Sequence, residues 1–219
     1  MMYLFDIDGT LIGGDGSGRR AFDQACLDCF GISGALDHLR LDGMTDPLIL
    51  DSVFQHHHGR RPTEDETRSI FDAYVAHLER EVKEGKYHVK PAVHDTLDKL
   101  ERDGATIGLA TGNLEVGARI KLQRGDLWQR FSFGGYGSDA AERAHLVKVA
   151  IERGTKLARR SFLPAEVTVI GDTPRDIAAA HACGARAVAV ATGWYTLEQL
   201  VEAGADAAYP TMAEWLATI

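Results

Sequence analysis

Two aspartates separated by one residue follow an apolar stretch at the start of the chain. Residues 2–7 read as a β-strand, and side chains on an extended chain repeat every second residue, so Asp6 and Asp8 project to the same side. Two carboxylates at one place repel each other unless a cation lies between them or one of them holds a proton. The pair therefore predicts a site for an oxygen-preferring metal ion such as Mg²⁺, or acid–base chemistry, or both.

A calcium-binding EF-hand loop also begins with Asp-x-Asp, but it needs an acid or amide at position five and a glutamate at position twelve. Thr10 and Ser17 occupy those positions here, which excludes an EF-hand. Gly9 instead favours a sharp bend directly after the strand.

The run Asp6-Ile7-Asp8-Gly9-Thr10 resembles motif I of the haloacid dehalogenase superfamily, whose members are mostly Mg²⁺-dependent phosphatases. The resemblance implies that Asp6 is the nucleophile that becomes an aspartyl phosphate and that Asp8 is the general acid–base. Dehalogenase members lack the second acid, because a halide leaving group needs no proton. Asp8 therefore favours phosphoryl transfer, and this role needs its pKa to be raised by the neighbouring acids.

A second motif follows the apolar strand expected at residues 105–110. Thr111-Gly112-Asn113 can offer a hydroxyl and backbone N–H groups to a phosphate oxygen, and it resembles motif II, which binds the substrate. The third motif of the family supplies a cation that balances the phosphate and the carboxylates. We expect Arg143, at the start of a helix, to fill that role, with Lys148 as the alternative further along the same helix.

Two more acids, Asp172 and Asp176, follow the buried strand expected at residues 167–170. The segment Gly171-Asp172-Thr173-Pro174-Arg175-Asp176 resembles motif IV, which completes the Mg²⁺ shell. The resemblance therefore implies a metal site formed by residues from both ends of the sequence: Asp6, Asp8, through its backbone carbonyl, Asp172 and Asp176.

Apolar strands that alternate with amphipathic helices predict an α/β fold, a doubly wound parallel sheet whose ligands bind at the carboxyl ends of the strands. The segment 15–88 departs from this pattern because it is all helical. Asp46-Pro47 indicates one helix start, with Asp46 as the cap, and Thr63 to Glu66 form a capping box that opens another. We therefore expect residues 1–14 and 89–219 to form the catalytic core and residues 15–88 to form an inserted helical cap.

In the resembled family, such a cap covers the active site and selects the substrate. Arg19, Arg20 and residues 43–46 are the candidates for contacting it. His56, His57 and His58 are consecutive on a helix and point in different directions, so they cannot all bind one ion.

The composition restricts the partners and the compartment. A formal charge of −8 disfavours nucleic acid and anionic membranes as partners. The three cysteines are an odd number without framework spacing, and no stretch reads as a leader or a membrane span, which favours the cytoplasm. Monomer and homodimer both remain open.

The sequence thus predicts a Mg²⁺-dependent phosphatase that hydrolyses a small phosphorylated metabolite, similar to phosphoglycolate phosphatases. One alternative is a sugar-phosphate mutase of the β-phosphoglucomutase type. Another is a receiver-like domain that accepts a phosphoryl group without turning it over, which the helical insertion and the Thr111-Gly112 turn disfavour.

Overall fold

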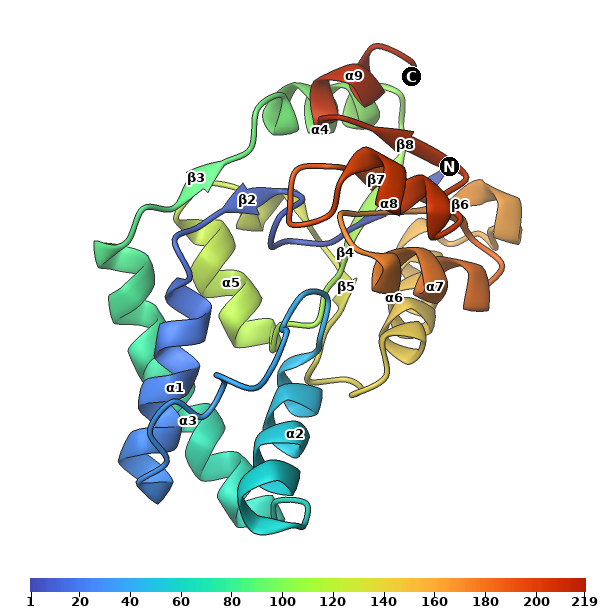
Figure 1. The fold of residues 1–219 in the computed structure, drawn as a ribbon. Helices are drawn as coiled ribbons and strands as arrows, with labels where there is room; N and C mark the ends of the chain where they lie inside the picture. Colours follow the sequence, from blue (N-terminus) through green and yellow to red (C-terminus); the bar gives the residue numbers. More distant parts are fainter.

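The protein, described over residues 1–219 by a computed structural model, is built around a six-stranded parallel sheet (Figure 1). The strands lie in the order β5-β4-β1-β6-β7-β8, with β1 paired to β4 on one side and to β6 on the other. Their bounds are β1 Met2–Phe5, β4 Thr106–Ala110, β5 Gly134–Gly135, β6 Val167–Gly171, β7 Arg186–Val190 and β8 Ala207–Tyr209. The predicted α/β fold is confirmed.

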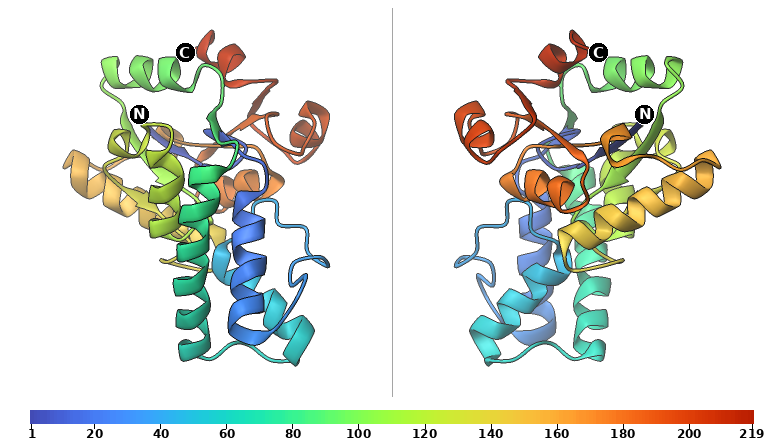
Figure 2. Two further views of the ribbon diagram at one scale, coloured as in Figure 1. Left: turned by 90° about the vertical axis from the view of Figure 1, so that its left-hand side faces the viewer. Right: turned by 90° about the vertical axis from the view of Figure 1, so that its right-hand side faces the viewer.

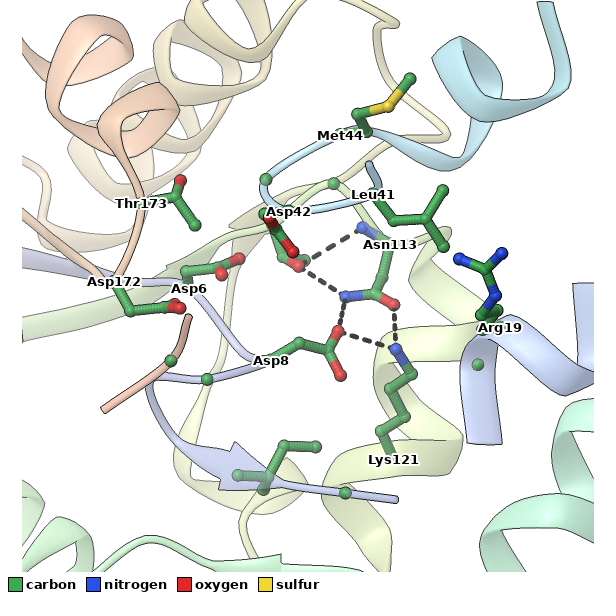
Figure 3. Close-up of a pocket in the computed structure, with 18 of the residues that line it drawn as sticks. Asp6, Asp8, Arg19, Leu41, Asp42, Met44, Asn113, Lys121, Asp172 and Thr173 are labelled. Atoms are coloured by element: carbon green, nitrogen blue, oxygen red, sulfur yellow. Dashed lines mark hydrogen bonds and ion pairs between the residues drawn. The ribbon is translucent and has the colours of Figure 1, made fainter. Parts of the chain in front are cut away.

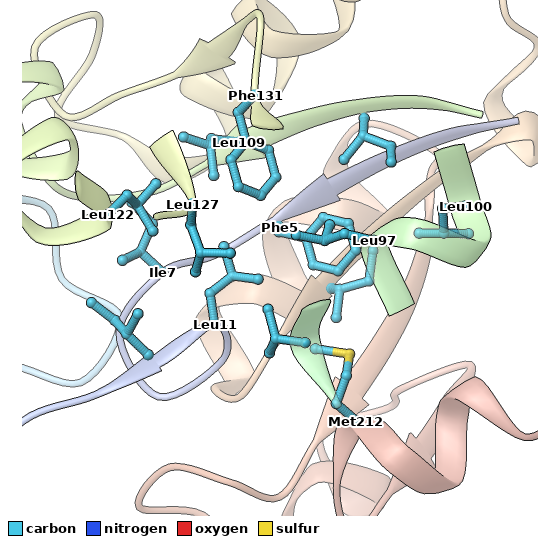
Figure 4. Close-up of a cluster of buried hydrophobic side chains, with 14 of the residues drawn as sticks. Phe5, Ile7, Leu11, Leu97, Leu100, Leu109, Leu122, Leu127, Phe131 and Met212 are labelled. Atoms are coloured by element: carbon cyan, nitrogen blue, oxygen red, sulfur yellow. The ribbon is translucent and has the colours of Figure 1, made fainter. Parts of the chain in front are cut away.

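Helices cover both faces of this sheet because neighbouring side chains of each strand point to opposite sides. On β1, Phe5 packs against α4 (Val93–Arg102), α5 (Glu115–Gln123) and α9 (Met212–Leu216) in one apolar cluster (Figure 4). Leu4 belongs to the cluster on the other face, with α6 (Arg143–Ala158), α7 (Pro174–Ala182) and α8 (Leu197–Glu202). This burial on both faces explains why the strands read as nearly continuous apolar runs.

The three helices α1 (Ser17–Phe30), α2 (Asp46–His58) and α3 (Glu64–Glu84) form a separate unit that extends away from the sheet (Figure 2). They enclose an apolar cluster of their own, in which the rings of Phe22 and Tyr74 pack with their centroids 5.1 Å apart. The predicted capping box of Thr63 and Glu66 is present at the start of α3. The predicted cap of α2 was wrong: Thr45 is the N-cap residue, and its hydroxyl accepts from the backbone N–H of Leu48.

Two short antiparallel strands, β2 (Ile12–Gly13) and β3 (His88–Val89), carry the chain into and out of the helical unit. The unit also contacts the sheet directly, because the backbone N–H of Asp46 donates to the carbonyl of Gly112 over 2.8 Å. The loop before α2 therefore lies against the carboxyl end of β4. No helix has the length and the apolar character that crossing a membrane requires.

Candidate active site

The register of the sheet brings three of the sequence motifs to one edge. Phe5 on β1 lies beside Leu109 on β4 and beside Ile170 on β6, so the three strands end almost level. Asp6, Thr111 and Asp172 are the first or second residues after those pairs, and they consequently emerge side by side. All three are buried.

Carboxylate oxygens of Asp6, Asp172 and Asp176 lie within 4.8 Å of one another. Burial raises the pKa of Asp6 to about 7, and the neighbouring charges of Asp176 and Asp8 add to the effect, while Arg143 opposes it. Burial also holds the pKa of Asp172 well above its ordinary value, with Asp6 and Asp176 contributing. The cluster therefore concentrates more negative charge than its protein neighbours neutralise.

The chemistry of this donor set fits a hard divalent cation, since Mg²⁺ prefers carboxylate oxygens. Thr10 donates to Oδ1 of Asp172, which leaves Oδ2 of Asp172 free for a ligand, and Thr173 donates to Oδ2 of Asp176. Oδ1 of Asp176 is buried and forms an ion pair with Arg143 without a hydrogen bond of good geometry. The residues present thus suit a bound Mg²⁺ with Asp6, Asp172 and Asp176 as its carboxylates.

Arg143 is the cation that the structure places at this cluster. Its Nη2 atom lies 2.7 Å from Oδ1 of Asp6 and 2.6 Å from Oδ1 of Asp176, and its Nη1 atom donates to the carbonyl of Gly43. Lys148, the alternative from the sequence, is exposed on α6 and does not line the cavity. It lies more than one turn beyond Arg143, so the helix carries it away from the strand ends.

Two glycines make room for the carboxylate of Asp172. A Cβ atom on Gly9 would lie 2.3 Å from Oδ2 of Asp172, and one on Gly193 would lie 1.8 Å from the same atom. Gly9 also has a φ of +86°, a conformation that other residues adopt at a cost. Glycine is therefore required at this position of motif I both by the bend after β1 and by the close approach of Asp172 from motif IV.

Asp8 points toward a different group of side chains from Asp6 (Figure 3). Its Oδ2 atom accepts from Nζ of Lys121 over 2.7 Å and from Nδ2 of Asn113 over 2.8 Å. Nζ of Lys121 also donates to Oδ1 of Asn113 over 2.6 Å, which closes a triangle of polar groups. Nδ2 of Asn113 further donates to the hydroxyl of Thr111, linking the triangle to the buried threonine.

The expectation that neighbouring acids raise the pKa of Asp8 was wrong. The side chain of Asp8 is half exposed to the cavity, and the surrounding protein desolvates it enough to act in that direction. The ammonium of Lys121 and the hydrogen bonds from Lys121 and Asn113 outweigh this effect, so the pKa of Asp8 is lowered. Asp8 is therefore a carboxylate in this state of the protein, whereas Asp6 is the carboxyl whose pKa is raised.

Sequence reasoning missed Lys121. The residue lies on α5, and its helical neighbours at the same face, Gly117, Ala118 and Leu122, are buried with it. A lysine at a position that the helical repeat assigns to the buried face was the available signal, because a buried lysine needs a charged partner. Asp8 is that partner.

Asp46 also enters the site instead of capping its helix. It is buried, its Oδ2 atom accepts from the backbone N–H of Leu114 over 2.8 Å, and burial raises its pKa to about 6. The charge of Lys121 opposes this increase and the charge of Asp8 adds to it, so the ionisation of Asp46 is linked to that of Lys121 and Asp8.

The cavity above these residues has a volume of about 460 Å³ and is lined by both the sheet and the helical unit. Arg19 lines it and donates to the carbonyl of Leu36. Arg20 does not line it, because its guanidinium pairs with Asp15 and Glu81. Of residues 43–46, all but the buried N-cap Thr45 line the cavity, together with Leu41 and Asp42.

Gly112 shows how closely the two parts of the protein meet at this cavity. A Cβ atom there would lie 2.4 Å from the backbone carbonyl of Met44. The glycine of the second motif is therefore required by the contact with the loop before α2, in addition to its place at the end of β4.

The sequence model for haloacid dehalogenase-like hydrolases matches residues 3–190, which include all four motifs. The chain belongs to the haloacid dehalogenase-like hydrolases. It is accordingly an enzyme, and this sets aside the interpretation as a non-enzymatic receiver-like domain.

Two haloacid dehalogenase-like relatives cover nearly the whole chain. The probable phosphatase IndB of Dickeya dadantii is 28% identical over 216 residues, which cover 97% of this chain and 90% of that protein. A phosphoglycolate phosphatase of Photorhabdus laumondii is 26% identical over 219 residues, covering 98% and 90%.

Solved structures share the haloacid dehalogenase-like fold. A hydrolase from Pseudomonas syringae superposes with a TM-score of 0.78 at 24% identity, covering 100% of this chain and 98% of the other. A Bacteroides vulgatus protein assigned as a β-phosphoglucomutase superposes with a TM-score of 0.73 at 22% identity, covering 99% and 86%. At these identities the likeness establishes the fold alone.

Proposed function

We propose that this protein is a Mg²⁺-dependent phosphatase that hydrolyses a small phosphorylated metabolite through a phosphoryl group carried on Asp6. The observation that carries the proposal is the meeting of Asp6, Asp172 and Asp176 with Arg143 and Thr111 at one edge of the sheet. Relatives named as phosphatases that cover nearly the whole chain support the same reaction.

Asp6, Asp172 and Asp176 would hold the metal, which neutralises negative charge so that a carboxylate can approach a phosphate. Asp6 then attacks phosphorus, and the bond from phosphorus to the ester oxygen breaks. The hydroxyl of Thr111 and the guanidinium of Arg143 bind the phosphoryl oxygens and hold them in line with the nucleophile. The N–H groups around Gly112 and Asn113 can join them.

Asp8 moves the protons. In the first step it gives a proton to the departing alkoxide, which leaves as an alcohol. In the second step it takes a proton from the water that attacks the phosphoryl group on Asp6, and inorganic phosphate and free Asp6 result. Asp8 is an ionised base in the present arrangement, and the negative charge of an arriving phosphate raises its pKa toward the protonated form that the first step needs.

We further propose that residues 15–88 are the cap of this enzyme and that residues 1–14 and 89–219 are its core. The loop before α2 supports this division, because its residues line the cavity over Asp6 and Asp8. A cavity of about 460 Å³ suits a small metabolite better than a protein or a nucleic acid. Arg19 and Lys121 line the same cavity and favour a substrate whose organic part is itself acidic or strongly polar, such as phosphoglycolate.

The test is phosphate release from a panel of small phosphorylated metabolites, with and without Mg²⁺. We expect Asp6→Asn to keep the fold and to abolish turnover of p-nitrophenyl phosphate and of any substrate found. Substantial residual turnover in that variant would remove Asp6 as the nucleophile.

A mutase is the second candidate, favoured by the fold shared with the β-phosphoglucomutase-like neighbour. A mutase would return the phosphoryl group from Asp6 to a second hydroxyl of the sugar instead of to water. Incubation with a hexose 1-phosphate, followed by separation of the sugar phosphates, distinguishes the two. The hexose 6-phosphate would indicate a mutase, and free phosphate with free sugar a phosphatase.

A further inference from the structure

Three imidazole rings from two separate segments meet on the outside of the helical unit. His38 lies in the loop between α1 and α2, whereas His56 and His57 lie in the last turn of α2. One ring nitrogen of each lies within 4.8 Å of those of the other two, and all three side chains are exposed. None of them lines the catalytic cavity, so the cluster is separate from the site described above.

The three rings pack closely against one another. His38 and His56 stack with their centroids 3.8 Å apart and their planes 16° from parallel. His57 stands nearly perpendicular to both, at 77° to His38 and 83° to His56. An imidazole in its neutral form offers a lone pair that binds a metal ion.

His58 does not take part, although it follows directly in the sequence. Its ring packs against Phe54 at 5.1 Å and against Phe30 at 6.5 Å between centroids. This agrees with the expectation that three consecutive helical histidines cannot all bind one ion. What the sequence did not reveal is that His38 comes from another segment to join the other two.

We propose that His38, His56 and His57 form a binding site for a borderline transition-metal ion of the Zn²⁺, Ni²⁺ or Cu²⁺ class. These ions favour imidazole nitrogen, whereas Mg²⁺ favours the carboxylates of the catalytic cluster, so the two sites select different metals. Zinc–nitrogen bonds of about 2.0–2.1 Å require the nitrogens to lie within about 4 Å of each other. Exposed imidazoles reach this by small rotations, which also unstack His38 from His56. The carboxyl end of α2 adds a favourable negative dipole.

An ion at this site would tie the loop of residues 31–45 to the far end of α2. The same loop supplies Leu41, Asp42 and Met44 to the lining of the catalytic cavity, and the carbonyl of Leu36 that holds Arg19. Metal binding would therefore restrict the part of the helical unit that covers the cavity.

The experiment is a Zn²⁺ titration of the full chain by isothermal titration calorimetry, with Mg²⁺ present throughout, repeated on His38→Gln, His57→Gln and His94→Gln. His94 is exposed on α4, which belongs to the sheet side of the protein, and it serves as the matched control. We expect the wild type and His94→Gln to share one Zn²⁺-binding event that is weakened roughly tenfold or more in His38→Gln and His57→Gln. Any binding at the catalytic carboxylates stays the same in all four proteins.

Equal Zn²⁺ binding in the wild type and His38→Gln would overturn the proposal. The proposal would also fail if the wild type bound Zn²⁺ only with millimolar or weaker affinity. Electron paramagnetic resonance of bound Cu²⁺ gives a second readout. We expect coupling to more than one nitrogen in the wild type and loss of one nitrogen in His38→Gln. Neither measurement depends on turnover, so the metal site and the phosphatase proposal stand or fall separately.

Discussion

Nζ of Lys121 lies 2.7 Å from Oδ2 of Asp8, and the two residues are 113 positions apart in the sequence. Lys121 is buried on α5, and its charge is what keeps the pKa of Asp8 low. The pair joins the general acid–base of the proposed reaction to a helix that carries none of the recognised motifs. Because Lys121 keeps Asp8 ionised before substrate binds, Asp8 is then in the form that acts as the base of the second step.

Replacing Lys121 by Met should raise the pKa of Asp8, because desolvation by the surrounding protein then acts without the opposing ammonium. Asp8 must hold a proton in the first step, which is the step that kcat/KM reports, so the basic limb of the profile of kcat/KM against pH should move to higher pH. The overall loss should stay below the roughly 10²–10⁴-fold that general acid–base catalysis supplies, since Asp8 itself remains. Lys148→Met, which changes an exposed lysine outside the cavity, is the control. An unchanged basic limb in Lys121→Met would show that Asp8 does not depend on Lys121.

Arg143 should be indispensable in a way that Lys148 is not. Its guanidinium bridges Asp6 and Asp176 while holding the carbonyl of Gly43. A lysine has one ammonium and cannot reproduce that fork, so Arg143→Lys should lose about 10²–10³-fold in kcat. Lys148→Met should match the wild type. The steady-state rates of both variants at saturating Mg²⁺ decide the point, and comparable losses in the two would remove Arg143 as the motif III cation.

The metal-free protein should lose stability as the pH rises toward 7. The folded-state pKa of Asp6 is raised from 3.8 to about 7, so between those values the folded protein holds a proton that the unfolded chain releases. The unfolded state then binds fewer protons than the folded state, so the free energy of unfolding falls with increasing pH. Chemical denaturation in EDTA at a series of pH values between 4 and 8 measures this slope.

Asp6→Asn removes the ionisable group, and its slope should be smaller than that of the wild type. Asp95→Asn, an exposed change on α4, should keep the wild-type slope. Adding Mg²⁺ should flatten the wild-type slope, because a bound cation favours the ionised carboxylates. A wild-type stability that increases over this range would contradict the charge balance described for the cluster.

Gly9 and Gly104 provide a matched test of the space beside Asp172. Both have a positive φ, +86° and +71°, so alanine at either should cost about 1–2 kcal/mol of stability. A Cβ on Gly9 would lie 2.3 Å from Oδ2 of Asp172, whereas one on Gly104 would meet nothing within 4 Å. Gly9→Ala should therefore lose activity and Mg²⁺ affinity, and Gly104→Ala should lose stability alone. Thermal unfolding and Mg²⁺-dependent rates separate the two effects, and equal activity in both variants would contradict the crowding at Asp172.

The sequence by itself determined the fold class and the acids of the site. Asp6 and Asp172 follow apolar strands, and parallel strands end at a common edge, so local pattern and elementary topology together bring those two residues close. The capping box at Thr63 and Glu66 was equally visible, because its hydrogen bonds join residues three apart.

Only the tertiary structure decided what surrounds Asp8. Lys121 lies on α5 and Asp46 in the first turn of α2, two segments whose local patterns predict ordinary helices. Neither residue has a short-range partner that would mark it as part of the site. The side on which a helix lies over the sheet, and its rotation about its own axis, fix whether such a side chain reaches the site. From the sequence we therefore expected acids around Asp8 and a raised pKa. The packing of α5 instead places a buried ammonium beside Asp8 and lowers the pKa of Asp8.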